Sequence, residues 1–411
     1  MTEDFINMLG LYGSGATGRK FEKALSADEI SCALKSARRY GCLFVAYVGA
    51  KNSFEGILPD ELDSTLAEKT KEQRLRYAAK QMRATEIFNS LDEAEIPWAI
   101  LKGWSVGRYY ADPLTRASND IDLLVYPDDE EKALEIFRQM GFNTEYNRTE
   151  GSHHTELTKP EYGLVELHID IAEPEVLDVW CGGGERFRLS GPFVKASNGV
   201  GEFYALCPED ALYSVAYHTF KDFITGVPSV KGAIDLALSV RACPKESLIG
   251  FWENMSRKKL DRVVCAILDG AVKYCTFTRE ELDIPDWYDG KMTDVYFDDI
   301  ENSAKYPREM PLDAIRALAD KHIKENGGEK TISATYSKLG LLFPPCDVME
   351  RRYKYLKKAP FLLPFAWACR IFSYLFLRSK DKRKSDAESG EAQKEASKRR
   401  LDLYRRFGMM D

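Results

Sequence analysis

The pattern of apolar and polar positions along the chain is clearest in its middle, where it predicts two buried strands. Residues 121–125 form an apolar run, interrupted only by Asp122, that ends before Pro127, and residues 98–101 form a shorter run that follows Pro97. Short apolar runs between turn residues are typical of strands that are covered on both faces. We therefore expect both segments to lie inside a sheet.

Residues 164–171 follow a different pattern, in which apolar and polar side chains alternate. The polar positions of this segment are Glu166, His168 and Asp170. Alternation with a period of two is typical of a strand that buries one face. The turn residues at 160–163 and the preceding segment 153–158 predict that this strand is the second arm of a hairpin.

Helical periodicity dominates much of the remaining chain. Apolar residues recur at helical spacing over 61–95, over 130–140 and over much of 208–275. Ser26 and Glu29 have the spacing of a capping box, which predicts the start of another helix. The sequence therefore predicts an α+β fold: a small mixed sheet with helices, followed by a mainly helical domain.

These patterns divide the chain into four expected parts. An N-terminal helical segment, 1–95, would pack on a core formed by residues 96–205. A mainly helical domain, 206–378, would follow, and residues 379–411 would form a charged linker and a C-terminal helix.

The glycine-rich stretch 13–20 interrupts the first helical region and comes near the P-loop pattern. Arg19 stands where that pattern requires lysine, and Lys20 stands where it requires serine or threonine. No strand clearly precedes the stretch. We therefore expect a linker here and no phosphate-binding loop.

Composition and charge exclude several classes of protein. The 411 residues are 44% hydrophobic and 30% charged, which is ordinary for a globular protein. A net charge of −7 gives no strong signal of nucleic-acid binding. The nine cysteines include no Cys-x-x-Cys pair, and the acidic N-terminus lacks the layout of a signal peptide. These features predict a reducing, cytoplasmic environment.

Residues 359–377 are the most apolar window of the chain. Pro360 and Pro364 fall near its start and Arg370 lies in its middle, which argues against a membrane span. We expect a helix that packs against the helices of 205–275. Basic residues on both sides of the window leave a peripheral membrane contact as the alternative.

Asp120 and Asp122 stand at the head of the buried strand and are the centre of the functional hypothesis. Side chains two residues apart on a strand share a face, so both carboxylates should point the same way. Carboxylates held close together repel each other unless a cation lies between them, and Mg²⁺ prefers such oxygen ligands. The pair therefore predicts a metal site for Mg²⁺, or for Mn²⁺ in its place.

A turn before this strand offers a place for phosphate groups. Gly103 would let the backbone approach a phosphate closely, and Lys102 and Ser105 could add a positive charge and a hydroxyl. Arg116 could reach the same phosphates or pair with an acidic neighbour, and the sequence leaves both alternatives open. A third carboxylate on the neighbouring strand would then bind a second metal ion.

In this order the motifs resemble the uncharacterised nucleotidyltransferase family of the DNA-polymerase-β-like superfold. The resemblance rests on Leu101-Lys102-Gly103, Tyr109-Tyr110-x-x-Pro113-x-x-Arg116, Asp120-Ile121-Asp122-Leu123-Leu124-Val125 and Val165-Glu166-Leu167-His168. It extends through Pro208-Glu209-Asp210-Ala211-Leu212, His218, Asp235 and Leu363-Pro364-x-Ala366-Trp367 with Arg370.

The resemblance implies a two-metal site and the transfer of NMP from an NTP such as ATP. Carried onto this chain, it makes Asp120 and Asp122 the metal pair, Gly103 the phosphate turn and Glu166 the third carboxylate. Asp170 and His168 are secondary candidates, because Asp170 lies outside the matching stretch and a lone imidazole on a polar strand face is more often a hydrogen-bonding partner. The superfold's turn is usually Gly followed by Gly or Ser, whereas Trp104 follows here.

Two other functions remain open beside NMP transfer to an unidentified hydroxyl of a small molecule, sugar, peptide or protein. A non-catalytic nucleotide-binding or regulatory protein could keep the same fold. A glycosyltransferase also binds its nucleotide-sugar through an Asp-x-Asp pair, but it usually needs a larger parallel α/β domain before that pair. The residues before Trp98 are instead expected to be helical.

Overall fold

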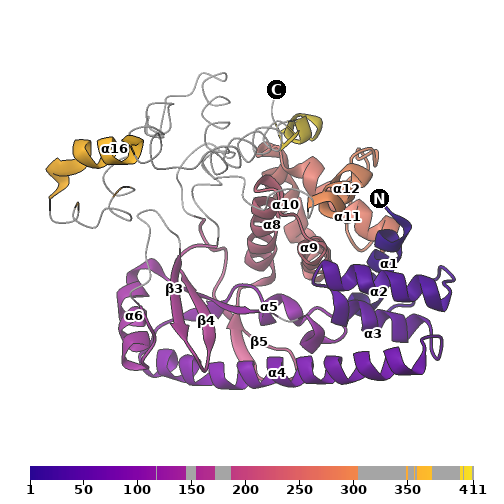
Figure 1. The fold of residues 1–411 in the computed structure, drawn as a ribbon, viewed down its shortest axis with the longest axis horizontal. Helices are drawn as coiled ribbons and strands as arrows, with labels where there is room; N and C mark the ends of the chain where they lie inside the picture. The colour runs from indigo at the N-terminus through magenta and orange to yellow at the C-terminus, as the bar shows by residue number, and fades with distance from the viewer. Residues whose placement is uncertain are drawn as a thin grey trace. The chain divides into compact units, whose positions relative to one another are not determined.

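A computed structural model shows how these segments fold (Figure 1). The residues that the structure describes are 1–116, 118–144, 154–171, 187–303, 349, 356, 359–372, 399–400 and 402–409. Residues 1–304 form one compact unit together with 407–409, and the other described residues belong to a second unit. The candidate site lies entirely in the first unit.

A mixed six-stranded sheet, in the order β3-β4-β2-β1-β6-β5, forms the core of the first unit. Its strands are β1 (Trp98–Ile100), β2 (Asp120–Val125), β3 (His154–Lys159), β4 (Gly163–His168), β5 (Val194–Ser197) and β6 (Glu202–Ala205). β2 pairs antiparallel with β1 and parallel with β4, and β3 and β4 form a hairpin. The predicted strands and the predicted hairpin are therefore confirmed, whereas the sequence patterns missed β5 and β6.

Two helices cover one face of this sheet. The long helix α4 (Asp60–Glu93) runs along the sheet, and α6 (Glu130–Gln139) packs beside it (Figure 1). The odd-numbered residues of β2 and β4 lie in one buried cluster with side chains of both helices: Ile121, Leu123, Val125, Val165, Leu167, Ile87, Phe88, Leu134 and Phe137. Each such side chain contributes about 1.5–3 kcal/mol through burial, so this face holds the sheet in place.

The first 53 residues form three helices, α1 (Glu3–Thr17), α2 (Ala27–Arg39) and α3 (Leu43–Ser53). The linker expected at 13–20 is therefore wrong over most of its length, because α1 continues through it to Thr17. The glycines there serve close packing: a Cβ on Gly15 would collide with the backbone of α3, and a Cβ on Gly49 would collide with the backbone of α1. The helix ends only at Gly18, which has a φ of 73°.

A series of helices follows the sheet and confirms the predicted α+β fold. They are α8 (Pro208–Ile224), α9 (Val230–Ala242), α10 (Lys245–Arg257), α11 (Asp261–Tyr274) and α12 (Thr293–Ser303). Pro208 occupies the first turn of α8, where its missing N–H costs no hydrogen bond. The expected domain boundaries after residues 95, 205 and 378 stay predictions.

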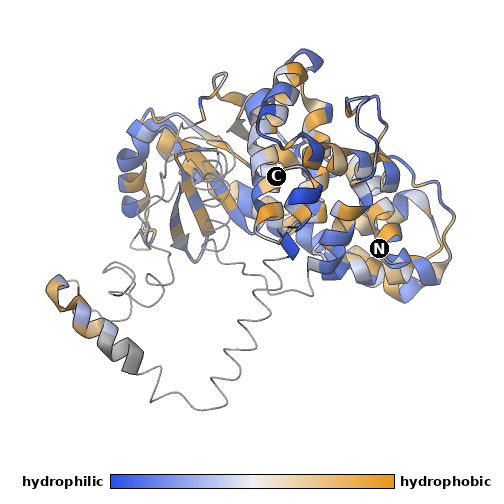
Figure 2. Cartoon of the chain, turned by 90° about the horizontal axis from the view of Figure 1, so that it is seen from above, coloured by the Kyte–Doolittle hydropathy of each residue, from blue (hydrophilic) through white to orange (hydrophobic). Residues whose placement is uncertain are grey.

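The described part of the apolar window forms a short 3₁₀ turn, η5 (Pro360–Leu362), and the helix α16 (Leu363–Phe372). Apolar residues recur along this segment (Figure 2). In the part of the chain that the structure describes, no helix is long and apolar enough to cross a membrane. Residues 373–377 lie outside the described residues, and the packing of the window against residues 205–275 stays a prediction.

At the C-terminal end, residues 402–406 are helical, in line with the expected C-terminal helix. The charged linker, expected from residue 379 to residue 392, lies outside the described residues.

Candidate metal and nucleotide site

The pairing of β2 with β4 brings the predicted carboxylates to one face of the sheet. Asp122 stands opposite Glu166 in the parallel register, and Leu124 stands opposite His168. Because side chains alternate along each strand, Asp120, Asp122, Glu166 and His168 all lie on the face away from α4 and α6. The same alternation that builds the core thus gathers the polar groups on the other side.

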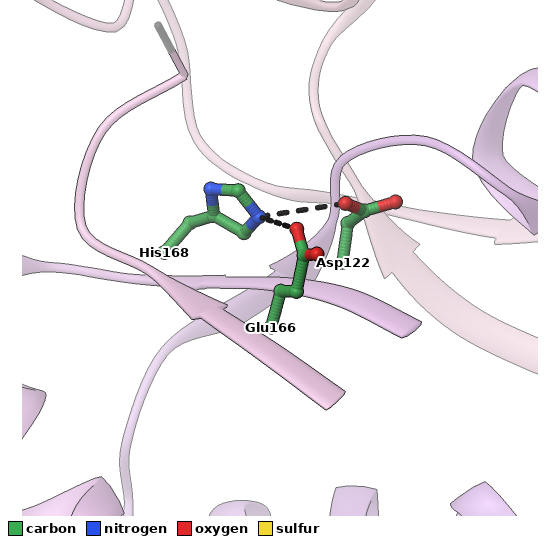
Figure 3. Close-up of side chains that lie close together, drawn as sticks. All are labelled: Asp122, Glu166 and His168. Atoms are coloured by element: carbon green, nitrogen blue, oxygen red, sulfur yellow. Dashed lines mark ion pairs between the residues drawn. The ribbon is translucent and has the colours of Figure 1, made fainter. Parts of the chain in front are cut away.

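Three of these side chains converge closely (Figure 3). One potential ligand atom from each of Asp122, Glu166 and His168 lies within 4.8 Å of the other two. The Nε2 atom of His168 is 3.4 Å from Oδ1 of Asp122 and 3.3 Å from Oε2 of Glu166. His168, a secondary candidate from the sequence, is therefore part of the cluster.

The cluster has the properties of a site for a divalent cation. It offers two carboxylates and an imidazole, and the side chain of Asp122 is only 3% exposed. Its Oδ1 atom is buried, and the groups beside it are the ammonium of Lys102, at 3.0 Å, and the imidazole of His168. A buried oxygen in this state favours a cation as its partner, and carboxylate oxygens suit Mg²⁺ and Mn²⁺. The residues therefore fit a divalent metal.

The electrostatic field of the cluster keeps its carboxylates ionised. Burial alone would raise the pKa of Asp122, but the charges of Lys102 and His168 outweigh burial and lower it. A hydrogen bond from His168 lowers the pKa of Glu166. Burial opposes the charge of His168, yet its hydrogen bonds to Asp122 and Glu166 raise its pKa overall. Each charge in the cluster thus depends on its neighbours.

Asp120 lies two residues nearer the start of β2 and outside this cluster. Its Oδ1 atom accepts a hydrogen bond of 2.5 Å from the hydroxyl of Ser118. Asp120, Asp122 and Ser118 all line one cavity. The two aspartates therefore face a common space, as the sequence predicted, but only Asp122 contacts the imidazole.

That cavity has a volume of about 550 Å³, which is in the usual range of small-molecule sites. Its wall includes the loop between α2 and α3, the start of β2, and residues of α8 and α9. The charged and imidazole side chains that matter most here are Lys102, Arg116, Asp120, Asp122, His218 and Lys231. Cations and carboxylates thus share one space, as a metal-bound polyphosphate would require.

The turn at Gly103 has a backbone conformation that favours glycine. Its φ is 57° and its ψ is −110°, a region that side-chain-bearing residues rarely adopt. The helix that follows, α5 (Trp104–Gly107), is a single turn. Ser105 is 1% exposed and lies outside the cavity lining, whereas Ser118, which the sequence patterns did not mark, lies in it.

Arg116 forms a buried ion pair with Asp235 of α9. Its Nε atom donates to Oδ1 at 3.1 Å, and its Nη2 atom donates to Oδ2. Tyr110 also donates to Oδ1 of Asp235, at 2.7 Å. The structure thus supports the pairing alternative for Arg116, and Arg116 lines the cavity as well.

Two residues remain to be placed: Asp170, a secondary candidate from the sequence, and Lys231, which no motif marked. Asp170 lines a second cavity of about 450 Å³, beyond the end of β4, and does not line the first. Lys231 is the second residue of α9, and it lines the first cavity. Repulsion from Arg116, followed by burial, lowers the pKa of Lys231. No sequence motif singled out Lys231, because only the fold brings α9 to the sheet.

Comparison with known proteins gives one family match and one similar solved structure. Residues 26–275 match the family described as uncharacterised nucleotidyltransferase, which covers more than half of the chain. No curated protein sequence matches. A solution structure of the antibiotic-resistance factor ANT(2'')-Ia is similar over 43% of this chain and 95% of its own, with 15% identity and a TM-score of 0.30.

The fold is that of an α+β protein, and the cluster of Asp122, Glu166 and His168 could hold a metal ion. The chain belongs to the uncharacterised nucleotidyltransferase family.

Proposed function

We propose that this protein transfers NMP from an NTP, with ATP as the first donor to test, onto a hydroxyl group in the presence of Mg²⁺ or Mn²⁺. The observation that carries the proposal is the cluster of Asp122, Glu166 and His168 beside a cavity that Lys102, Arg116 and Lys231 also line. Membership of the family supports the general activity. The small mixed sheet argues against the glycosyltransferase alternative.

In this proposal Asp120, Asp122 and Glu166 hold the metal ions. Bound there, the metal ions would neutralise charge on the phosphates and orient them. The nearby imidazole of His168 would hold Asp122 and Glu166 in place through its contacts at 3.4 and 3.3 Å. Removing either aspartate would leave the phosphate charge without its counter-ion.

The cations of the cavity would bind the polyphosphate. Lys102 approaches it from the turn after β1 and Lys231 from α9, and Arg116 is held in a fixed orientation by Asp235. α9 also points its N-terminus at the cavity, since Ser229 and Gly232 line it. Backbone N–H groups at a helix N-terminus favour an anion. Repulsion between Lys231 and Arg116 would be relieved by an anion between them.

Glu166 would accept the proton of the acceptor hydroxyl. The hydroxyl oxygen attacks the α-phosphorus, the bond from the α-phosphorus to the bridging oxygen breaks, and pyrophosphate leaves. The lowered pKa of Glu166 keeps it ionised before the reaction, as a base must be. His168 lies 3.3 Å from the same carboxylate and would hold its orientation.

The test is transfer of label from α-labelled NTPs, one at a time, to acceptors in a cell extract. The full-length protein should label an acceptor only with Mg²⁺ or Mn²⁺ present, and chelation should stop the reaction. The double variant D120N/D122N is the negative control. NTP binding without metal-dependent transfer would favour the non-catalytic alternative and overturn the proposal.

A further inference from the structure

Lys102 occupies an unusual position for a residue expected to bind phosphate. Its Nζ atom lies 3.0 Å from Oδ1 of Asp122, the same oxygen that His168 contacts at 3.4 Å. On its other side, Nζ lies 3.5 Å from Nδ1 of His218 on α8. The ammonium therefore lies between the carboxylate of Asp122 and the imidazole of His218 on α8.

The surroundings of Lys102 favour its charged form in this place. Burial opposes the charge, but the carboxylates of Asp122, Glu166 and Asp120 together outweigh burial and raise the pKa of Lys102. His218 is held neutral, because burial and the charge of Lys102 lower its pKa. A neutral imidazole can accept a hydrogen bond from the ammonium. Lys102 thus provides the positive charge that a buried carboxylate needs.

A divalent ion and this ammonium would compete for the same oxygen. Magnesium binds carboxylate oxygens at about 2.0–2.1 Å, so an ammonium 3.0 Å from Oδ1 would be close to it and repelled. The backbone at this point is fixed, since the N–H of Leu101 donates to the carbonyl of Asp122 at 3.0 Å. The lysine side chain has several rotatable bonds and can move on its own.

We propose that Lys102 is a built-in counter-ion for Asp122, which gives way when a divalent ion binds and then turns its ammonium to the polyphosphate in the same cavity. This inference rests on the metal site of the proposed function. Lys102 is in this sense a positioning residue for the site: it stabilises the metal-free protein and lowers the affinity of the site for the metal.

The experiment measures Mn²⁺ binding to the full-length protein by titration calorimetry, without nucleotide. K102M keeps the length of the side chain and removes its charge. It should bind Mn²⁺ at least about tenfold more tightly than the natural protein, because the competing ammonium is gone. Unchanged or weaker Mn²⁺ affinity in folded K102M would overturn the inference.

Lys80 provides a matched control. It also lies near the aspartates, but its Nζ donates to the backbone carbonyl of Asn119 at 2.7 Å instead of pairing with Asp122. K80M removes the same charge from the same region, so it should tighten Mn²⁺ binding by no more than about threefold. Equal gains in K80M and K102M would show a general field effect and contradict the specific exchange.

Thermal melting gives a second readout. Without metal, K102M should melt below the natural protein, because Asp122 loses a partner for its buried charge. Saturating Mn²⁺ should reduce the difference in melting temperature between K102M and the natural protein. If K102M does not fold, K102Q takes its place in both measurements, because it keeps a hydrogen-bond donor without the charge. The same outcomes would then support or overturn the inference.

The design separates the inference from the proposed function on which it rests. If the natural protein binds Mn²⁺, D122N does not, and K102M equals the natural protein, only the role of Lys102 is overturned. If the natural protein itself binds no Mn²⁺, the proposed metal site is contradicted, and so is the role of Lys102.

Discussion

The two faces of strands β2 and β4 have opposite tasks. On one face Ile121, Leu123 and Leu167 are almost fully buried against α4 and α6. On the other face, Asp122 and His168 are nearly as inaccessible, with side chains 3% and 5% exposed. Burial alone therefore does not distinguish a stabilising face from a functional one; the partners of the buried groups do.

The difference between the faces is one of energy. Burying the apolar face stabilises the fold without further conditions. Burying a carboxylate costs several kcal/mol unless a counter-charge accompanies it, and here Lys102 and His168 supply that charge. The polar face is thus tolerated because of a network, and that network is what a metal ion and a nucleotide would rearrange.

The largest effect is expected from neutralising the polar face. D122N and D120N should each reduce NMP transfer by roughly 10³-fold or more, because an amide cannot supply the charge that binds the metal and, through it, the phosphates. Initial rates with the acceptor found in extract would measure this. Near-normal turnover in either variant, with an unchanged melting profile, would contradict the two-metal assignment.

A substitution on the apolar face should have the opposite effect: it should lower stability and leave activity per folded molecule unchanged. L123A would leave a cavity in the cluster against α4 and α6 and lower the free energy of unfolding by about 2–5 kcal/mol. Leu123 is 0% exposed and faces away from the site. Denaturant unfolding would measure the loss, and activity per folded molecule should stay near normal. A selective loss of activity without a loss of stability would show that the faces are coupled.

A smaller effect should distinguish the two acidic candidates on β4 and just after it. E166Q should lose about 10²-fold in turnover as the proton acceptor is removed. D170N should lose much less, because Asp170 lines the second cavity. Measured turnover of the two variants under identical conditions decides, and the reverse order would move the role of third carboxylate to Asp170.

The sequence predicted the strands of the site because their signal is local. Alternation over 164–171 and the apolar run 121–125 were sufficient to place Asp122 and Glu166 on polar strand faces. The register between the strands, and the placement of Lys231, depend on contacts between distant segments. Arg116 and Asp235 lie 119 residues apart, so their pairing could not be read from spacing.

The one clear misreading, the linker at 13–20, has a physical cause of a different kind. Glycines in sequence indicate a turn or a close approach with equal weight. Gly15 and Gly49 serve close approach, because α1 and α3 touch backbone to backbone there. This close approach becomes visible only when the two helices are paired, and the sequence of one helix does not indicate it.

The smallest effect concerns the apolar window, where two faces again differ. Ala366 is fully buried with Leu356 and Met349, whereas Phe361 and Phe365 are 80% and 62% exposed. A span would place Arg370 near mid-membrane at a cost of about 2.5–3.5 kcal/mol on insertion scales. We therefore expect the intact protein in the supernatant after fractionation at both low and high salt. Pelleting with lipid that resists salt and needs detergent for release would overturn this expectation. Pelleting only at low salt would instead indicate an electrostatic, peripheral contact through the basic residues beside the window.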